Sequence, residues 1–308
     1  MAGKRTEIRP FGPEAIAAAA ALIRDGQPVA VPTETVYGLA ADATNPRAVA
    51  RIYEAKGRPS FNPLIVHVPD VTSAARLGVL SEEARALAEQ HWPGPLTLVV
   101  PLAEGSPVAS LVTAGLPTIA LRVPAHPAMR ALLEASGRPL AAPSANASGR
   151  ISPTRAAHVL ASLDGRVDLV IDGGSCAHGL ESTIVAFTGG PPRLLRPGPV
   201  QVPQAISRDA GAVEAPGMLA SHYAPAKPLR LNAGERRPGE WLIGFGKVAG
   251  DSSLSPAGDL AEAAARLFDL LYLADASPAR AIAVAPIPDV GLGRAINDRL
   301  ARAAAPRP

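Results

Sequence analysis

Several residue types are scarce in this chain of 308 residues. A single cysteine, Cys176, excludes an internal disulfide and a cysteine zinc cluster. The six histidines show no metal-ligand spacing such as H-E-x-x-H, so we assign no metal site. Aromatic residues make up only 4% of the chain, which gives little support to a surface that stacks single-stranded bases.

Long apolar runs are also missing. No segment reaches the ~18 to 20 apolar residues that a membrane span needs, and "MAGKRTEIRPFG" lacks the apolar core of a signal peptide. We therefore expect a cytoplasmic protein with no membrane contact. A hydrophobic content of 47% with 19% charged residues is typical of a globular chain that buries a sizeable core. The net charge of +3 allows an anionic partner without requiring one.

Lysine is the rarest of the common charged residues. It occurs only at positions 4, 56, 227 and 247, so arginine supplies most of the positive charge. Lys56 is therefore conspicuous in "KGRPSFNP" (56–63), a segment that also holds Arg58, the amide of Asn62 and two prolines. Neither a helix nor a strand accommodates this segment easily.

Three familiar motifs are absent or lack their context. The sequence contains no G-x-x-x-x-G-K-[ST] phosphate loop. "GFGKVA" (244–249) matches a relaxed dinucleotide fingerprint, but no helix follows it, so we interpret it as a strand end with a glycine turn. Cys176 has His178 nearby, but proximity in sequence is weak evidence for a nucleophile and its base, and we interpret Cys176 as an unreactive thiol.

Helical and strand patterns alternate along the chain, which favours an α/β fold. One predicted helix begins near Pro13 and stops at Gly26, and another has Asn45 as N-cap, Pro46 at its first position and Gly57 past its end. Residues 207–228 are rich in Pro, Gly and Ala without a period and are predicted to be a linker. We expect three parts: a catalytic domain at 1–206, the linker at 207–228 and a small β/α domain at 229–308.

Polar clusters recur at the expected strand ends. Each places hydroxyls, amides or cations beside prolines or glycines that fix the backbone. The clusters are "PTETVYGL" (32–39), "KGRPSFNP" (56–63), "PSANASGRIS" (143–152), "LEST" (180–183) and "LLRPGP" (194–199). Because donors outnumber acids in these clusters, they predict a shared pocket for a polyanionic ligand.

In this order, "PTETVYGL", "KGRP" with "NPL", "PSAN", "ESTIV" and "LRPG" resemble the YrdC/Sua5 family of threonylcarbamoyl-AMP synthases. The tail, with "HYAP", "GFG" and "GLGRAINDRLARAA", resembles the C-terminal domain of the longer Sua5 branch. The resemblance implies a YrdC-like twisted, open, mixed sheet with helices, followed by a small Rossmann-like α/β domain.

The resemblance also implies a reaction. L-threonine, bicarbonate and ATP would give threonylcarbamoyl-AMP, pyrophosphate and water. Downstream tRNA threonylcarbamoyltransferase proteins would use the product to form N6-threonylcarbamoyladenosine at position 37 of tRNAs that read codons beginning with A. The enzyme would thus be a nucleotidyltransferase in tRNA processing. Its partners would be ATP, threonine, bicarbonate and those proteins, and tRNA or double-stranded RNA remains an open candidate.

Site residues follow from the resemblance position by position. The catalytic positions would be Lys56, Arg58 and Asn146. The threonine site would comprise Thr35, His67, Arg122, Ala142 and Ser182. The ATP site would comprise Arg58, Asn62, Thr118, Ser144, Ser152 and Arg196. The resemblance further implies that His222 and Tyr223 of the linker form a lid over the site. Without it, His67 would be interpreted as an ordinary buried histidine with satisfied hydrogen bonds.

This chemistry explains two cations in one loop. A carbamate attacking the α-phosphorus of ATP brings two anionic groups together, and fixed cations reduce their repulsion. No acidic pair for a metal is evident, so we expect Mg²⁺ to enter with the triphosphate of ATP and to be held mainly by it.

Two other functions remain open. Because the chain resembles domains associated with RNA binding, one alternative function is a double-stranded RNA or tRNA-binding module without synthase activity. Carbamoyl transfer in hydrogenase maturation uses a related domain, but that family carries zinc-finger and acylphosphatase-like parts, which are missing here.

Overall fold

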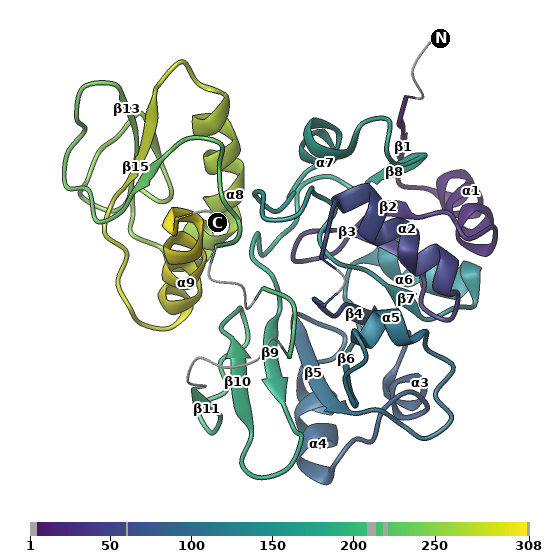
Figure 1. The fold of residues 1–308 in the computed structure, drawn as a ribbon. Helices are drawn as coiled ribbons and strands as arrows, with labels where there is room; N and C mark the ends of the chain where they lie inside the picture. Colours follow the sequence, from purple (N-terminus) through teal and green to yellow (C-terminus); the bar gives the residue numbers. More distant parts are fainter. Residues whose placement is uncertain (1–4, 60, 208–213, 218–220, 307–308) are drawn as a thin grey trace.

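The computed structural model describes residues 5–59, 61–207, 214–217 and 221–306, which form two lobes, each built on its own sheet (Figure 1). In the larger lobe the described residues form an 11-stranded sheet of order β1-β8-β2-β3-β7-β4-β6-β5-β9-β10-β11. Its strands are β1 (Glu7–Pro10), β2 (Val29–Pro32), β3 (Tyr37–Asp42), β4 (Ile65–His67), β5 (Leu96–Pro101), β6 (Thr118–Arg122), β7 (Leu140–Ala141), β8 (Leu169–Asp172), β9 (Thr183–Ala186), β10 (Arg193–Arg196) and β11 (Ile206–Ser207).

The helices of this lobe are α1 (Pro13–Arg24), α2 (Pro46–Lys56), α3 (Val71–Ala75), α4 (Glu82–His91), α5 (Ser110–Thr113), α6 (Pro127–Ser136) and α7 (Ala156–Leu163). The sheet is mixed: β4 runs parallel to β6, whereas β2 and β3 are antiparallel, as are β5 and β6. The predicted α/β class with a mixed sheet and helices is confirmed for this lobe.

Helix α2 shows why local sequence signals were sufficient in places. The Asn45 side chain accepts hydrogen bonds from the backbone N–H groups of Arg47 and Ala48, and Pro46 occupies the first turn. Gly57 ends the helix in the left-handed conformation with φ of 57°. The predicted start and end of this helix are therefore confirmed.

Opposite faces of the large sheet bury different groups. On one face, Val66 and Leu121 belong to the main core, which is covered by helices such as α2 and α4. Because side chains alternate along a strand, His67 and Arg122 lie on the other face. Helices α1 and α6 cover one end of that face, over β2, β3, β7 and β8. Its other end, over β4, β6, β5 and β9, packs against Ala215 of the linker (207–228).

The C-terminal lobe contains β12 (Leu229–Arg230), β13 (Glu240–Gly244), β14 (Ser252–Ser253), β15 (Ala281–Val284), α8 (Leu260–Ala276) and α9 (Leu292–Ala304). Its described strands form a parallel sheet of order β12-β15-β13-β14. After β13, the chain turns back through a backbone hydrogen bond from Phe245 to Val248 and enters β14, with no helix between them. The interpretation of "GFGKVA" as a strand end with a glycine turn is confirmed.

Helix α8 lies on the side of the C-terminal lobe that faces α7 of the larger lobe (Figure 1). His158 of α7 stacks on Tyr272 of α8 with ring centroids 3.9 Å apart, and the Tyr272 hydroxyl donates to the carbonyl of Ile151 at 2.8 Å. Gly179 packs so closely on α8 that a Cβ there would lie 2.5 Å from the carbonyl oxygen of Ala264. The lobes therefore form a close contact.

No helix in the described ranges is both long and apolar enough to cross a membrane.

Candidate active site

A narrow cavity lies on the sheet face that the linker covers. Its walls come from the turn between β2 and β3, the ends of β4, β6 and β10, the loop after β7, and the linker. The lining residues are Thr33, Thr35, Val36, Gly38, Arg58, Ile65, His67, Arg122, Ala142, Pro143, Ser144, Glu181, Arg196, Pro216, Gly217, His222 and Tyr223. Its volume is about 40 Å³, far below the roughly 300–1,000 Å³ of pockets that hold a drug-sized ligand. A cavity of this size cannot enclose a nucleotide.

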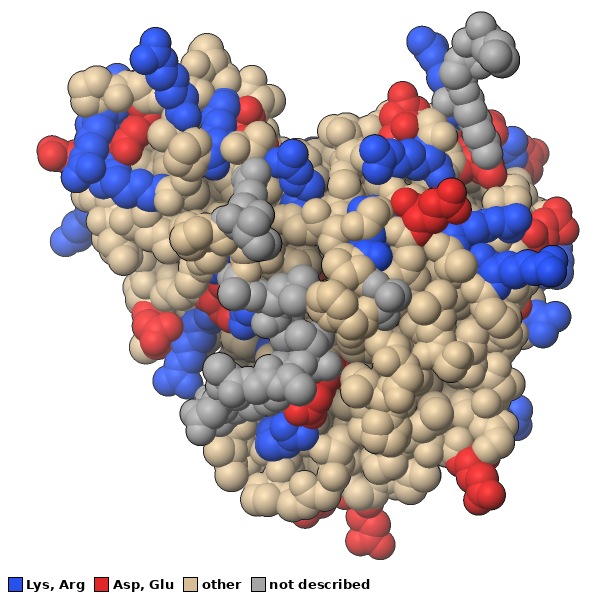
Figure 2. All heavy atoms as spheres, viewed as in Figure 1, with Lys and Arg blue, Asp and Glu red and all other residues tan. Residues whose placement is uncertain are grey.

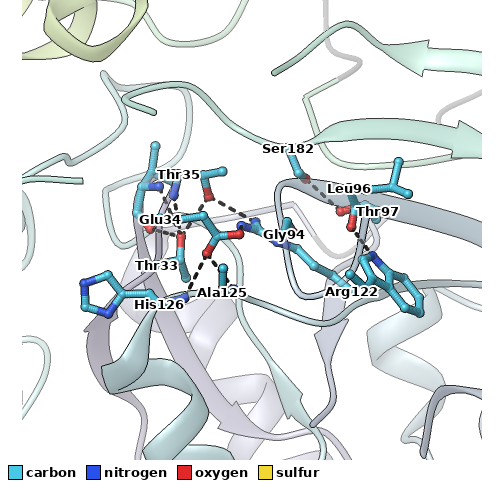
Figure 3. Close-up of polar contacts among 12 residues, drawn as sticks. Thr33, Glu34, Thr35, Gly94, Leu96, Thr97, Arg122, Ala125, His126 and Ser182 are labelled. Atoms are coloured by element: carbon cyan, nitrogen blue, oxygen red, sulfur yellow. Dashed lines mark hydrogen bonds and ion pairs between the residues drawn. The ribbon is translucent and has the colours of Figure 1, made fainter. Parts of the chain in front are cut away.

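One end of the cavity contains a buried ion pair (Figure 3). The guanidinium of Arg122 donates to the Glu34 carboxylate at 2.6 Å and to the Thr35 hydroxyl at 3.0 Å. The other Glu34 oxygen accepts from the backbone N–H of Ala125 at 3.1 Å. Burial raises the pKa of Glu34, but Arg122 and these hydrogen bonds outweigh it and lower that pKa to about 2. Glu34 is therefore ionised and fixes the orientation of Arg122.

His67 stands beside Arg122, since the two are paired in register on β4 and β6. Burial, followed by the positive charge of Arg122, lowers the pKa of His67 to about 3, so its ring is neutral at physiological pH. Neither ring nitrogen has a hydrogen-bond partner among the described residues. Instead of being a satisfied core histidine, His67 presents an unused donor and an unused acceptor at the cavity wall.

The other end of the cavity carries two arginines without a carboxylate partner in the described ranges. Arg58 donates to the carbonyls of Asn62 and Pro63, and Arg196 donates to the carbonyl of Ser182 at 3.0 Å and to its hydroxyl at 3.1 Å. Burial lowers the pKa of Arg58 to about 10, which leaves it protonated at neutral pH. This end is therefore positively charged, whereas at the first end the charge of Arg122 is neutralised by that of Glu34.

Lys56 does not line the cavity but bonds to a loop that forms part of its wall. Its ammonium group donates to the carbonyl of Ser144 at 2.5 Å and to the carbonyl of Asn146, and the residue is 2% exposed. Burial, followed by the charge of Arg58, lowers the pKa of Lys56 well below its usual value. Since it does not line the cavity, Lys56 fixes the 144–146 loop whose Ser144 forms part of the wall.

The sequence-predicted site residues fall into two groups. Those on the cavity wall are Thr35, Arg58, His67, Arg122, Ala142, Ser144, Arg196, His222 and Tyr223. Those off the wall are Lys56, Asn62, Thr118, Asn146, Ser152 and Ser182.

Residues of the second group differ in how they relate to the wall. Ser182 bonds to Arg196, and Ser152 donates to the Glu181 carboxylate at 2.5 Å, so both support wall residues. Asn146 donates to the carbonyls of Ala147 and Arg150. Asn62 is fully buried, and its side-chain amide has no partner among the described residues. Thr118 begins β6, four positions before Arg122 on the same strand face.

The linker closes the cavity on the side away from the sheet. Tyr223 is 1% exposed. The centroid of its ring lies 4.2 Å from the ring centroid of His222 and 5.8 Å from that of Phe268 on α8. Gly217 has φ of +80° and touches the Tyr223 hydroxyl so closely that any Cβ there would collide with it. This part of the linker is packed into the protein.

Sequence reasoning missed three charged residues. Glu34 and Glu181 lie within "PTETVYGL" and "LEST", but those clusters were interpreted through their hydroxyls. The third, Arg299, lies in the regular helix α9, reaches Glu181 at 2.7 Å and is fully buried. The only available signal for the two acids was an acidic residue inside a polar cluster next to a buried strand. For Arg299 there was no local signal.

Cys176 is buried at the edge of this region. Burial raises the pKa of its thiol, and its backbone N–H donates to the carbonyl of Thr154 at 3.0 Å. A neutral, enclosed thiol is a poor nucleophile, which favours the unreactive interpretation.

No group of three or more His, Cys, Asp or Glu residues that could hold a metal ion occurs in the part of the chain that the structure describes. Both carboxylates on or beside the cavity, Glu34 and Glu181, are held by arginines.

Known proteins match the chain over nearly its whole length. Residues 21–198 match the Sua5/YciO/YrdC family, described as "Telomere recombination", and residues 198–305 match the C-terminal domain of threonylcarbamoyl-AMP synthase. Threonylcarbamoyl-AMP synthase of Bacillus subtilis is 42% identical over 324 aligned residues, covering 95% of this chain and 93% of the relative. The corresponding protein of Pyrococcus abyssi is 40% identical, covering 92% of each.

A crystal structure of P. abyssi Sua5 complexed with L-threonine superimposes with a TM-score of 0.88 and 37% identity, covering 97% of each chain.

Proposed function

The chain belongs to the threonylcarbamoyl-AMP synthase family, and from this premise we propose that it condenses L-threonine, bicarbonate and ATP into threonylcarbamoyl-AMP, pyrophosphate and water. It is thus an enzyme of the nucleotidyltransferase type.

The observation that carries the proposal is the difference in charge between the two ends of one cavity. At one end, Arg122 is paired with Glu34 and stands beside the neutral His67. A nearly neutral site with both donors and acceptors suits a zwitterionic amino acid. At the other end, Arg58 and Arg196 have no carboxylate partner among the described residues, which suits the phosphates of ATP.

The reaction needs this arrangement. Threonine and bicarbonate form a carbamate with loss of water, and a carbamate oxygen then attacks the α-phosphorus of ATP while pyrophosphate leaves. Arg58 and Arg196 would stabilise the negative charge that gathers around the phosphorus. Arg122, Thr35 and His67 would hold threonine so that its amino group faces the phosphates, with Ala142 beside it. Lys56 and Asn146 would act by fixing the loop that carries Ser144.

Magnesium would arrive bound to the triphosphate. Because Glu34 and Glu181 are both committed to arginines, neither is available as a metal ligand without breaking a buried pair. We propose that the phosphate oxygens supply most of the Mg²⁺ ligands and that Mg²⁺ offsets the charge of the leaving pyrophosphate.

The linker would act as a lid. With His222 and Tyr223 in place, the cavity of about 40 Å³ is too small for ATP, so this wall must move for substrates to enter. When closed again, it would exclude water from the carbamate and from the mixed anhydride, both of which water hydrolyses.

We further propose that threonylcarbamoyl-AMP passes to proteins that transfer the threonylcarbamoyl group to adenosine 37 of tRNA. The lability of the mixed anhydride supports this, since such a product must be consumed by a group-transfer reaction soon after release.

The decisive test follows pyrophosphate release and identifies the product by mass spectrometry. The proposal expects release only when threonine, bicarbonate and ATP are all present, with appearance of the mixed anhydride. Arg58→Ala should lower the rate at least tenfold, while Arg85→Ala, an exposed arginine on α4, should leave it within twofold. Pyrophosphate release without threonine, or wild-type turnover of Arg58→Ala, would contradict the assignment.

The same experiment separates the alternatives. An RNA-binding module would bind tRNA and release no pyrophosphate, and carbamoyl transfer in hydrogenase maturation would not require threonine. On the face shown in Figure 2, basic and acidic side chains are intermingled, without the continuous basic stripe typical of a nucleic-acid groove.

A further inference from the structure

A groove on the larger lobe lies outside the site described above. It runs between α3, the last turns of α6 and the loop at Pro107, and its volume is about 810 Å³, within the roughly 300–1,000 Å³ of pockets that hold a drug-sized ligand. None of its described lining residues belongs to the wall of the active cavity. Helices α3 and α6 lie on the side of the larger lobe away from the C-terminal lobe (Figure 1). The groove is therefore a separate feature of the surface.

Helix α6 forms one side of the groove. Its lining residues follow one face of the helix, at spacings of three and four positions: Arg130, Leu133, Glu134 and Gly137. Gly137 ends the helix in the left-handed conformation, with φ of 64°. The chain then turns toward β7, and Arg138 of this turn lines the groove as well.

The floor of the groove is apolar and fixed by the protein core. Val68 and Leu77 belong to the main core and Leu133 to the core beneath α1 and α6, and each is at most 5% exposed. Three prolines also line the groove and restrict its backbone: Pro69, Pro107 and Pro139. Such a floor is already formed, so little ordering is needed before apolar side chains can pack on it.

Two arginines of the lining have donors to spare. Arg76, at the end of α3, and Arg130 are exposed, and neither forms a hydrogen bond or an ion pair through its side chain with a described residue. The backbone N–H of Ser73 donates to Asp70 at 2.6 Å and lowers the pKa of that carboxyl, to which the charge of Arg76 makes a smaller contribution. Both guanidinium groups can therefore bind carboxylates from outside.

The lining carries a net positive charge. A third arginine, Arg138, lies 3.7 Å from Asp42, whose carboxylate also accepts from the backbone N–H and the hydroxyl of Thr44. Among the described lining residues Glu134 is the one acid, and it forms no ion pair with them. Three arginines and one glutamate therefore select a negatively charged occupant.

The apolar floor decides which kind of anion fits. Arginine binds carboxylates and phosphates alike. Single-stranded nucleic acid gains affinity by stacking bases on aromatic rings, and no aromatic side chain occurs among the described lining residues. Double-stranded RNA presents phosphates and 2′-hydroxyls, which would leave the apolar floor unfilled. A peptide with apolar side chains between acidic ones satisfies both the floor and the arginines.

We propose that this groove is the docking site for an acidic peptide segment of a partner protein, whose apolar side chains fill the floor and whose carboxylates bind Arg76 and Arg130. The inference goes beyond the proposed function, because no residue of the groove takes part in the reaction. Helix α6 begins at the cavity, where the N–H of Ala125 donates to Glu34 at 3.1 Å, and its ten residues span about 15 Å. The docked partner thus lies about one helix length from that end of the cavity.

The test first selects ligands for the full-length wild type from random peptides displayed on phage. Enriched peptides are synthesised with a fluorescein label, and their Kd is measured by fluorescence anisotropy. Pyrophosphate release from threonine, bicarbonate and ATP reports whether each variant keeps its active cavity, and circular dichroism reports whether it folds.

Two groove variants address the floor and the charge separately. Ser73→Trp places a large ring at a position that lines the groove, and its control is Thr72→Trp, at an exposed position of α3 outside the lining. The double variant Arg76→Glu, Arg130→Glu reverses the charge of the lining. Both groove variants leave the residues of the active cavity unchanged.

We expect the enriched peptides to be acidic, to contain a large apolar residue and to bind the wild type with micromolar Kd. Each groove variant should weaken binding at least tenfold. Thr72→Trp should change it less than twofold, as should Arg85→Glu with Arg237→Glu, which makes the same change in net charge at exposed arginines outside the groove. Added salt should weaken binding, excess ATP should not displace the peptides, and all variants should release pyrophosphate within twofold of the wild-type rate.

Several results would refute the docking site. They are a failure to enrich any peptide, enriched peptides without acidic residues, displacement by ATP, or equal affinity for the wild type and both groove variants. If labelled tRNA binds and loses affinity when the charge is reversed, while no peptide does, the groove binds nucleic acid and the proposal is wrong.

Two further measurements keep the test decisive. Should the double variant not fold, Arg76→Ala and Arg130→Ala replace it singly, and each should weaken peptide binding at least threefold. Absence of pyrophosphate release by the wild type would count against the proposed function alone, because the peptide affinities are measured without substrates.

Discussion

Two buried arginine–glutamate pairs in this protein have nearly the same geometry and different consequences. Arg122 meets Glu34 at 2.6 Å inside the larger lobe, and Arg299 meets Glu181 at 2.7 Å across the two lobes. Arg122 also contacts Thr35 and faces the cavity, whereas Arg299 donates to Asp298 and Pro197 and lies off the wall. The difference shows that an arginine in a buried ion pair faces the cavity or not according to where its remaining donors are placed.

Burial and a neighbouring arginine shift the pKa of Glu34 in opposite directions, and the same is true of Glu181. Burial raises the pKa of each, and the neighbouring arginine outweighs it, so that the pKa of Glu34 falls to about 2 and that of Glu181 is also lowered. Each carboxylate is therefore stable only with its arginine present, so removing one partner tests what the other does.

The largest effect should come from Arg122→Met. It leaves Glu34 buried without its partner, which typically costs about 3–5 kcal/mol in the free energy of unfolding. Pyrophosphate release should fall at least a hundredfold, because the end of the cavity that we propose to bind threonine loses its cation. The double variant Glu34→Gln, Arg122→Met removes the unpaired charge. It should recover much of the stability in urea and none of the activity; recovery of activity as well would show that Arg122 does not bind substrate.

The second-largest effect should come from acid, which protonates Glu34 and weakens its pair with Arg122. With a pKa of about 2 in the folded protein and 4.5 as its ordinary value, Glu34 stabilises the fold above pH 4.5 and loses this contribution as pH falls toward 2. Between pH 7 and pH 3 the wild type should therefore lose about 2 kcal/mol of unfolding free energy more than Glu34→Gln does. Urea unfolding at both pH values measures this. Equal losses in the two proteins would show that the pair does not lower the pKa of Glu34.

His67 should make the stability depend on pH at higher pH values than Glu34 does. Its folded pKa is about 3 and its ordinary value is 6.5, so the unfolded chain takes up the proton first and stability falls as pH drops below 6.5. From pH 7 to pH 5.5 the wild type should lose about 1 kcal/mol more than His67→Gln. A nuclear magnetic resonance titration of the ring gives the pKa directly, and a value near 6.5 would mean that the ring is open to water.

Local signals in the sequence were sufficient for some elements and failed for others. Helix α2 was predicted with its ends because Asn45, Pro46 and Gly57 act on their immediate neighbours. Strand β3 was missed because "YGLAAD" holds glycine and alanine in place of branched residues, and only burial between two other strands makes it a strand.

The candidate site divides in the same way. Residues in turns at strand ends, such as Thr35 and Arg58, could be found because their clusters are compact in sequence. Lys56 was noticed for its rarity, but its bonds to the 144–146 loop depend on residues about 90 positions away. The Glu181–Arg299 pair spans 118 positions, and an arginine in a regular helix gives no sign of its burial.

The smallest effect should come from a third ion pair, which also joins the two lobes but is exposed to solvent. Arg155 of α7 meets Asp269 of α8 at 2.6 Å, with 52% of the arginine side chain exposed. Exposed pairs of this kind contribute below about 1 kcal/mol, because solvent screens them and two side chains must be ordered. The free energy of unfolding of Arg155→Ala should therefore lie within that margin of the wild-type value, and its turnover should stay within twofold. Urea unfolding and pyrophosphate release measure the two, and a loss well above about 1 kcal/mol would mean that this exposed pair holds the lobes together as a buried pair does.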